Sequence, residues 1–184
     1  KILKIRGKKM KKLLLIASAL LAFTFFGCNQ PGSPSAQTPA QSGAKELVLF
    51  DPATYDGEKV EIGGEVFAKI TPDQYNTTIN IDPPLDCSSV SKFKAKLCAP
   101  EANAGLNLTI KIADKDNADI SSIPLYGLVT EPTSCEVGFS KKEEWNTVSE
   151  TKLAAKVQPM VQESTEPYAA QSGVVVYVGK VTAE

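Results

Sequence analysis

The 184-residue chain contains no histidine. Histidine is the only side chain whose unperturbed pKa lets its charge change near neutral pH. Its absence excludes Ser-His-Asp and Cys-His catalysis, zinc sites with imidazole ligands and histidine-based pH switches. The sequence therefore predicts a protein that is not an enzyme and has no catalytic residues.

Arginine is also scarce, and the charges are unevenly divided. Residues 1–27 hold seven of the 20 basic residues and no acidic residue, although the net charge of the whole chain is −1. From Cys28 onward the remaining 13 basic residues, all lysines, face 21 acidic residues, which gives a net charge of −8. Nucleic-acid binding depends on positive potential and favours bidentate arginine contacts. Nucleic acid is therefore not an expected partner.

The basic N-terminal segment has the pattern of a signal peptide. Met10 is the expected true start, because it opens a charged stretch that leads into an uncharged apolar run over residues 13–26. This run is shorter than the roughly 20 residues that a membrane-spanning helix needs. We expect residues 1–27 to direct export.

The end of this run, Phe25-Phe26-Gly27-Cys28, resembles the lipobox of bacterial lipoproteins, with Phe25 where the family usually has leucine. The resemblance implies a diacylglyceryl group on the Cys28 thiol and cleavage directly before that cysteine. It implies a membrane-anchored protein of the bacterial cell envelope that faces the periplasm or the exterior. An ordinary secretory signal cleaved further on and an uncleaved anchor remain the alternatives.

The segment that follows Cys28 has the composition of a tether. Residues 29–44 contain three prolines, no charge and no aliphatic side chain larger than alanine, so they cannot bury a core. We expect residues 28–44 to hold a folded domain away from the bilayer. Asn29 is not aspartate, so the enterobacterial inner-membrane retention signal is absent.

Residues 45–184 have a length that suits a single domain, and their pattern is mainly β. Apolar residues alternate with polar ones over residues 59–70, where Gly63-Gly64 marks a bulge or bend. Helical patterns are confined to a short turn at residues 51–55 and to residues 141–157, which begin after a capping box. The other expected strands are 75–81, 106–112, 125–130, 136–139 and 174–181, the last of them central or closing.

Residues 51–57 (DPATYDG), followed by VEIGGEV at residues 60–66, resemble the opening of OB-fold domains of envelope proteins. The closing VYVGKV at residues 176–181 is similar to a late strand of that fold. The resemblance implies a small OB-like barrel with one or two short helices. A β-sandwich is the alternative.

Three cysteines remain after Cys28, and an exported domain lies in a compartment that permits disulfides. We expect a bridge between Cys87 and Cys98, which bracket a lysine-rich segment, with Cys135 as the alternative partner for either. A catalytic thiol would need a base, and there is no histidine to serve as one.

Other motifs carry no predicted chemistry. Two Ser-x-x-Lys matches, at residues 89–92 and 149–152, come without the accessory motifs of penicillin-interacting enzymes. The acidic stretch at residues 114–119 lacks the glycine and the glutamate of a calcium loop and is expected to form a solvated turn. The sequence therefore predicts no metal site and no cofactor.

Three aromatic residues are candidate ligand contacts. Phe67 falls on the polar face of the strand expected at residues 59–70, and Tyr75 and Tyr126 lie in other predicted strands. These observations favour a non-enzymatic, lipid-anchored envelope protein whose OB-like domain binds another envelope protein or a glycan. A small glycan-acting enzyme built on carboxylates and a passive surface-coat lipoprotein are the alternatives.

Overall fold

The computed structural model describes residues 46–139 and 147–184. These residues form eleven strands and one 3₁₀ turn, and no helix among them is long and apolar enough to cross a membrane. The elements are β1 (Leu47–Phe50), η1 (Pro52–Thr54), β2 (Lys59–Ile62), β3 (Glu65–Ile70), β4 (Ile79–Asp86), β5 (Phe93–Cys98), β6 (Asn103–Ala113), β7 (Asp119–Leu128), β8 (Thr133–Val137), β9 (Leu153–Glu163), β10 (Ala170–Gln171) and β11 (Val176–Ala183).

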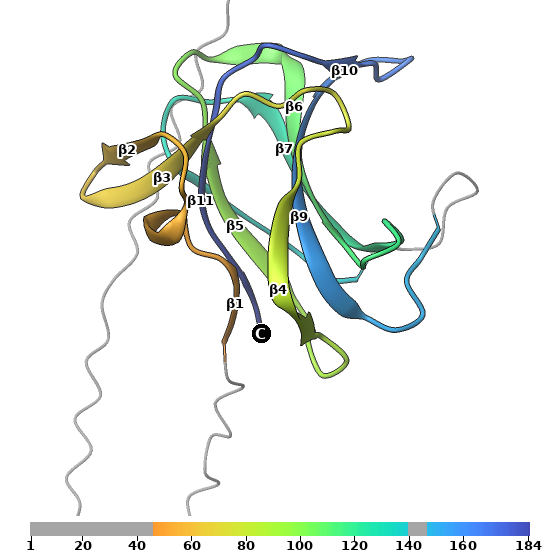
Figure 1. Cartoon of the computed structure of the whole chain (residues 1–184). Helices are drawn as coiled ribbons and strands as arrows, with labels where there is room; N and C mark the ends of the chain where they lie inside the picture. Colours follow the sequence, from red (N-terminus) through yellow and green to blue (C-terminus); the bar gives the residue numbers. More distant parts are fainter. Residues whose placement is uncertain (1–45, 140–146) are drawn as a thin grey trace, which may run out of the picture. The chain divides into compact units, whose positions relative to one another are not determined.

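The strands form two antiparallel sheets (Figure 1). Sheet I has the order β2-β3-β11-β5-β8, and β1 pairs with the end of β11. Sheet II has the order β10-β9-β6-β7, and β4 pairs with the start of β9. Neither sheet closes on itself within the described ranges, so the domain is not a barrel and the OB-like prediction is wrong. The architecture agrees with the alternative, a β-sandwich.

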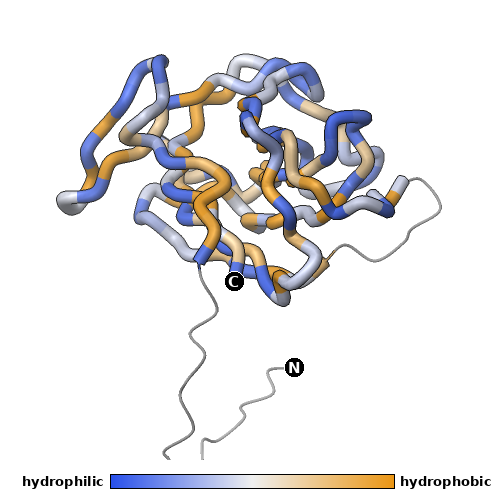
Figure 2. Tube along the Cα trace, turned by 60° about the horizontal axis from the view of Figure 1, so that its bottom comes forward, coloured by the Kyte–Doolittle hydropathy of each residue, from blue (hydrophilic) through white to orange (hydrophobic). Residues whose placement is uncertain are grey.

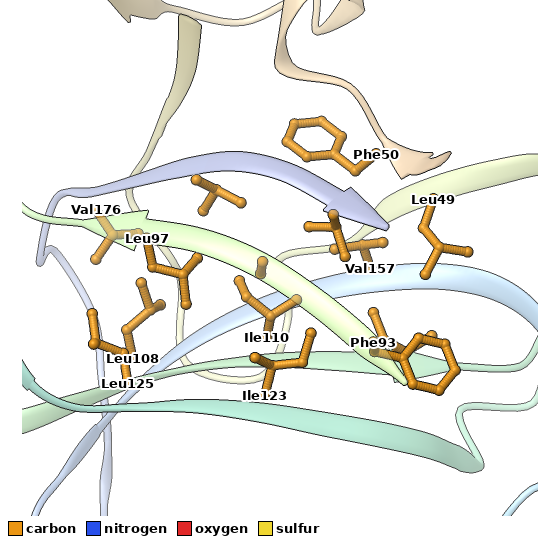
Figure 3. Packing of buried hydrophobic residues seen from close by; sticks show 14 of the residues in the cluster. Leu49, Phe50, Phe93, Leu97, Leu108, Ile110, Ile123, Leu125, Val157 and Val176 are labelled. Atoms are coloured by element: carbon orange, nitrogen blue, oxygen red, sulfur yellow. The ribbon is translucent and has the colours of Figure 1, made fainter. Parts of the chain in front are cut away.

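The core lies between the two sheets and takes side chains from both (Figure 3). In the middle of β6 Leu108, Ile110 and Ile112 are fully buried, while the intervening Thr109 and Lys111 are partly exposed. In Figure 2 hydrophobic and hydrophilic segments alternate along the strands in the same way. This alternation gives each sheet one inner and one outer face. The expected central strand is confirmed, because β11 lies between β3 and β5.

The long strand expected over residues 59–70 is instead the hairpin β2–β3, which projects from the rest of the domain in Figures 1 and 2. Gly63 and Gly64 both have positive φ, at 60° and 81°, and form its two-residue turn. In this hairpin Val60 pairs with Phe67, so the two residues lie on the same face of the sheet. In one continuous strand they would lie on opposite faces. Phe67 lies on the face opposite to the core residue Ala68 but is fully buried, and its predicted role as an exposed ligand contact is wrong.

The Phe67 ring is buried against the backbone of β11. A Cβ atom built at Gly179 would lie 3.0 Å from Phe67 Cε1 and 2.9 Å from the carbonyl oxygen of Lys96. Only glycine fits at that position, and its missing side chain makes the room that the ring occupies.

The motif that resembles the OB fold has a local structural role. Asp51 accepts a hydrogen bond from the backbone N–H of Ala53 at 2.9 Å and so caps the 3₁₀ turn, which starts at Pro52. The ring of Tyr55 packs edge-on against Phe50 and covers Gly57, where a Cβ would lie 2.4 Å from Tyr55 Cε1. The spacing of Asp, Pro, Tyr and Gly therefore serves a turn, and the short helical turn expected at residues 51–55 is confirmed.

The helix expected over residues 141–157 does not form where the structure describes this segment. Residues 140–146 lie outside the described residues, Val148 forms an isolated bridge with Asp119, and β9 begins at Leu153. Strand β9 pairs with β6 from Lys156 to Glu163. This long pairing outweighs the local capping pattern, because most of the stability of a helix comes from packing.

The predicted disulfide between Cys87 and Cys98 is absent, and Cys135 is also a free thiol. Residues 93–98 are the strand β5 and not a loop, so Cys98 lies about 17 Å beyond Phe93 at a rise of about 3.3 Å per residue. Cys87 precedes that strand, where its N–H donates to the carbonyl oxygen of Lys152 at 3.0 Å. A bridge needs Cα atoms within about 7 Å, and a strand between the two cysteines prevents this.

Burial raises the pKa of all three thiols, and that of Cys98 reaches about 11. They are therefore protonated and weakly nucleophilic at neutral pH.

Candidate ligand-binding groove

The outer face of sheet II carries side chains in rows that cross its three longest strands. On β6 the outward residues are Asn107, Thr109 and Lys111, and the register places one residue of β7 and one of β9 beside each. The rows are Tyr126–Asn107–Gln162, Pro124–Thr109–Met160 and Ser122–Lys111–Gln158. Amide and hydroxyl groups thus alternate with apolar surface along this face.

A groove of about 970 Å³ follows these rows, at the upper end of the usual size of ligand sites. Tyr75, Tyr126 and Tyr168, which belong to three separate segments, all line it. Their exposed fractions of 56%, 78% and 51% are the highest of the large hydrophobic side chains in the described residues. Aromatic rings that remain in water at a hollow make this face a candidate binding surface.

Tyr126 lies beside an irregularity between β6 and β7. The register shifts between Asn103 and Asn107, and Gly127 takes a positive φ of 72°. Asn107 Oδ1 accepts a hydrogen bond from the Gly127 N–H at 3.1 Å. Because that bond fixes the amide, the NH₂ group of Asn107 remains available as a donor.

Tyr75 lies in the turn before β4. Asp73 organises this turn: its N–H donates to the Thr77 hydroxyl at 2.9 Å, and its carbonyl accepts from the Asn76 N–H at 2.8 Å. The Asp73 carboxylate also accepts from the Ser172 hydroxyl at 3.1 Å, which ties the turn to the segment after β10. The strand expected over residues 75–81 therefore starts only at Ile79.

Tyr168 lies in the connection between β9 and β10 and has a positive φ of 52°. Its N–H donates to the carbonyl of Thr165 at 2.8 Å, and the Glu163 N–H donates to the carbonyl of Ala169 at 3.0 Å. The Glu163 carboxylate accepts from the Gln171 amide at 3.0 Å, which links the two sides of the loop.

The three tyrosines lie at one end of the sandwich. Tyr126 is level with the end of β9, Tyr168 follows that strand, and the bridge from Asp73 to Ser172 places Tyr75 near the start of β11. The domain begins at the opposite end, where Leu47 pairs with Ala183 at the end of β11 (Figure 1). The entry point of the N-terminal segment and the tyrosines are therefore separated by the length of β11.

Away from the tyrosines the groove contains one ion pair. Lys111 Nζ contacts Asp119 Oδ1 and donates to the carbonyl of Asn117 at 3.1 Å. The Asp119 side chain is buried, and its backbone is held by the segment at residues 147–149. The lysine therefore serves as counter-ion to a buried carboxylate.

The carboxylates that line the groove do not form a catalytic pair. Glu163 is level with Leu106 and Asp119 with Ala113, so about 23 Å of strand separates them at about 3.3 Å per residue. Glycosidases place their two carboxyl groups about 5–10 Å apart. The lining of this groove accordingly offers hydrogen bonds and stacking but not acid–base chemistry by two carboxylates.

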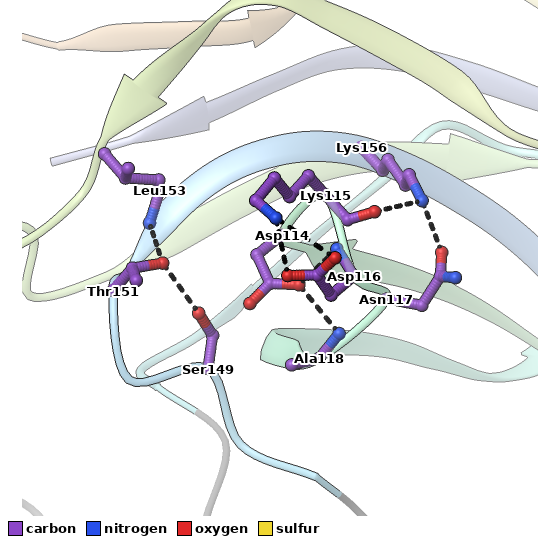
Figure 4. A network of polar contacts seen from close by, with 9 residues as sticks. All are labelled: Asp114, Lys115, Asp116, Asn117, Ala118, Ser149, Thr151, Leu153 and Lys156. Atoms are coloured by element: carbon purple, nitrogen blue, oxygen red, sulfur yellow. Dashed lines mark hydrogen bonds and ion pairs between the residues drawn. The ribbon is translucent and has the colours of Figure 1, made fainter.

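The acidic stretch at residues 114–119 forms the predicted turn (Figure 4). Asp114 Oδ1 accepts from the N–H groups of Asp116 and Ala118, both at 2.9 Å. Burial raises the pKa of the Asp114 carboxyl, but these bonds and one from the Ser149 hydroxyl outweigh it and hold the pKa below its usual value.

The ammonium group of Lys156 binds this turn from the neighbouring strand β9. It donates to Asn117 Oδ1 at 2.7 Å and to the carbonyl of Lys115 at 2.8 Å. Across residues 46–139 and 147–184, no cluster of three or more cysteine, aspartate or glutamate side chains is arranged to hold a metal ion.

Of the three aromatic residues predicted to contact a ligand, the structure brings Tyr75 and Tyr126 together at the groove and leaves Phe67 out of it. Tyr168 escaped the sequence reasoning. Its neighbours Glu166-Pro167 interrupt a strand-like pattern, and a tyrosine beside such a break is a signal of an exposed aromatic at a loop.

No protein-family model and no curated protein matches the sequence. Among solved structures, the chain is similar to the family 11 carbohydrate-binding module of a cellulosomal cellulase of Clostridium thermocellum, with 11% identity, a TM-score of 0.45 and coverage of 77% of this chain and 82% of that one. It is also similar to a low-affinity xylan-binding module, CBM86, of Roseburia intestinalis, with 17% identity, a TM-score of 0.38 and coverage of 76% and 93%. These TM-scores do not establish a shared fold, so the groove is interpreted from its own residues.

Proposed function

We propose that the protein is a lipid-anchored envelope protein that binds a glycan, without enzymatic activity, in the groove on sheet II. The observation that carries the proposal is the convergence of the exposed Tyr75, Tyr126 and Tyr168 on one hollow. Three separate segments supply these rings, so their proximity is a property of the folded domain.

The chemistry of the lining supports a sugar chain as the ligand. One face of a pyranose ring consists of C–H groups, which pack against the negative face of an aromatic ring. The hydroxyl groups at the ring edge need donors and acceptors, which Asn107, Thr109 and Gln162 supply beside Tyr126. A protein partner is less favoured, because the polar rows lie along a groove, which suits a ligand that is slender and rich in hydroxyl groups.

The position of the groove suits a tethered receptor. The tyrosines lie at the end of the domain opposite to Leu47, where residues 28–44 would join it. A lipid on Cys28 and a polar tether would leave the groove free to meet a ligand at a distance from the membrane.

Glycan binding is tested with the purified full-length protein in detergent against soluble β-glucan, xylan, mannan, chitin oligosaccharides and alginate, by native affinity electrophoresis and calorimetry. At least one polysaccharide should retard the protein, and Tyr126→Ala together with Tyr168→Ala should abolish the retardation. Tyr177→Ala, on the outer face of sheet I, is the matched control and should bind as the parent does. Retention by none of the glycans, or binding by the double variant at parental strength, would refute the proposal.

Anchoring is tested by the intact mass of protein recovered from the membrane fraction. The expected product begins at Cys28 and carries a diacylglyceryl adduct. A soluble product cleaved at another position would exclude the lipid anchor and would leave the groove proposal standing.

A further inference from the structure

We infer that the groove accepts an uncharged glycan chain and rejects polyanionic glycans such as uronates. The inference rests on the proposed function and names the class of ligand at the same site. The supporting observation is that the charged side chains lining the groove already have partners within the protein.

Among the described residues that line the groove, Lys111 is the only cation. Its ammonium group contacts Asp119, whose side chain is 5% exposed, and donates to the carbonyl of Asn117. A ligand carboxylate that captured Lys111 would leave the buried Asp119 without a counter-ion. Breaking a buried pair in this way is strongly unfavourable, so Lys111 is not free to bind anions.

The remaining charge in the lining is negative. The Glu163 carboxylate lies at the tyrosine end and accepts a hydrogen bond from Gln171, which leaves its charge in place. With Lys111 and Asp119 cancelling, the lining has a net charge of −1, and the chain from Cys28 onward has −8. A polyanionic chain would meet repulsion from both.

The other groups that face a ligand are neutral. Tyrosine rings, amides and hydroxyls occupy the outer rows, and Pro124 and Met160 flank Thr109 between them. Such a lining matches C–H faces and hydroxyl groups, and it offers an ionised group no compensation for lost hydration.

The test uses pairs of oligosaccharides that differ only in charge: a cellohexaose with its C6-oxidised uronate, and a β-1,4-mannohexaose with β-1,4-mannuronan hexasaccharide. Calorimetry at about 0.05 M salt, where the Debye length is about 14 Å, keeps electrostatic effects visible. We expect a neutral member to bind at least about tenfold more tightly than its acidic partner.

Equal or tighter binding of an acidic member would overturn the inference and leave the proposed function intact. If the protein binds neither oligosaccharide pair and none of the neutral polysaccharides, the inference is overturned. If it then binds only alginate, the inference is overturned but the groove is still supported as a glycan site. Failure of all glycans would overturn the inference and the proposed function together.

The Asp119→Asn variant tests the role of the ion pair directly. It removes the counter-ion while keeping the shape of the side chain, so it should free Lys111 and raise affinity for the mannuronan hexasaccharide at least about threefold at low salt. Asp116→Asn, which removes an exposed carboxylate beside Lys115, is the matched control and should change nothing. If Asp119→Asn does not fold, the pairs of oligosaccharides still decide the question with the parent protein.

Discussion

The two outer faces of the sandwich differ in how they use charge. On sheet I lysines of β5 alternate with buried residues and pair with carboxylates: Lys94 with Glu184 at 2.6 Å and Lys96 with Glu65 at 2.6 Å. On sheet II the outward residues of β6 and its neighbours are mostly amides, hydroxyls and apolar groups, and the exposed tyrosines lie at their end.

This difference explains why only one face is suited to a ligand. Exposed ion pairs keep a sheet surface hydrated and contribute little free energy of folding each. A face with few charges and with exposed aromatic rings loses less hydration energy when it is covered. The comparison therefore separates a solvated face on sheet I from the proposed recognition face on sheet II.

The strongest test of the difference between the two faces places the same new charge on each face. Thr109→Glu puts a carboxylate in the middle of the groove and should weaken glycan binding about 100-fold, which corresponds to about 2.7 kcal/mol. Ser134→Glu puts a carboxylate on the outer face of sheet I, beside Lys96, and should leave binding unchanged. Calorimetry measures both, and equal losses in the two variants would remove the distinction between the faces.

The covered part of sheet I is tested at Gly179. Gly179→Ala forces a Cβ to within 2.9 Å of the Lys96 carbonyl oxygen and 3.0 Å of the Phe67 ring. Overpacking of this kind should lower the free energy of unfolding by about 2 kcal/mol, measured by urea denaturation. Gly138→Ala, whose new Cβ meets its nearest atom at 3.5 Å, should be close to neutral. A Gly179→Ala protein as stable as the parent would contradict the close packing described for Phe67.

Asn107 tests whether the recognition face is held in shape by its own side chains. Asn107→Ala removes the bond to the Gly127 N–H and should cost about 1 kcal/mol of stability as well as glycan affinity. Asn107→Asp keeps the acceptor but loses the donor, so stability should be retained while affinity falls. Thermal unfolding and calorimetry separate the two effects, and parental affinity in both variants would exclude a contact with the ligand.

The smallest effect is expected from the ion pairs of sheet I. Hydrogen bonds and attraction from Lys94 and Lys92 lower the pKa of Glu184 below its usual value of 4.5. A lowered pKa means that the carboxylate stabilises the fold above about pH 4.5 and that this contribution is lost as the pH falls through the folded value. Glu184→Gln should therefore reduce stability slightly at pH 7 and by less at pH 3. Urea unfolding at both values measures this, and an equal loss at pH 3 would refute the ionic origin.

Much of the strand content was predictable from alternation. The pattern at residues 106–112 predicted the middle of β6, and the double-sided apolar pattern at residues 174–181 predicted a central strand, now seen as β11. These two signals are reliable because they arise from burial on one face or on both.

Other predictions failed where local signals have two physical meanings. Gly63-Gly64 suits a bulge in one strand as well as a two-residue hairpin turn, and the turn places Val60 on the same face of the sheet as Phe67. Phe67 lies on the face opposite to the core residue Ala68 and is buried there beside Gly179, which alternation alone does not reveal. The capping pattern before residues 141–157 suits a helix, but the pairing of β9 with β6 determines the conformation from Leu153 onward. The cysteine spacing suits a bridge only if residues 93–98 are a loop, and they are β5.

The sequence by itself determined the basic composition of residues 1–27, the uncharged composition of residues 29–44, the acidic character of the remaining chain and its largely β content, because composition and alternation are properties of a linear chain. Tertiary structure decided that the strands form an open sandwich and that Tyr75, Tyr126 and Tyr168 line the same groove. It also decided that the cation of that groove is neutralised by Asp119. These relationships join residues from distant parts of the chain, and only the pairing and register of the strands bring such residues together.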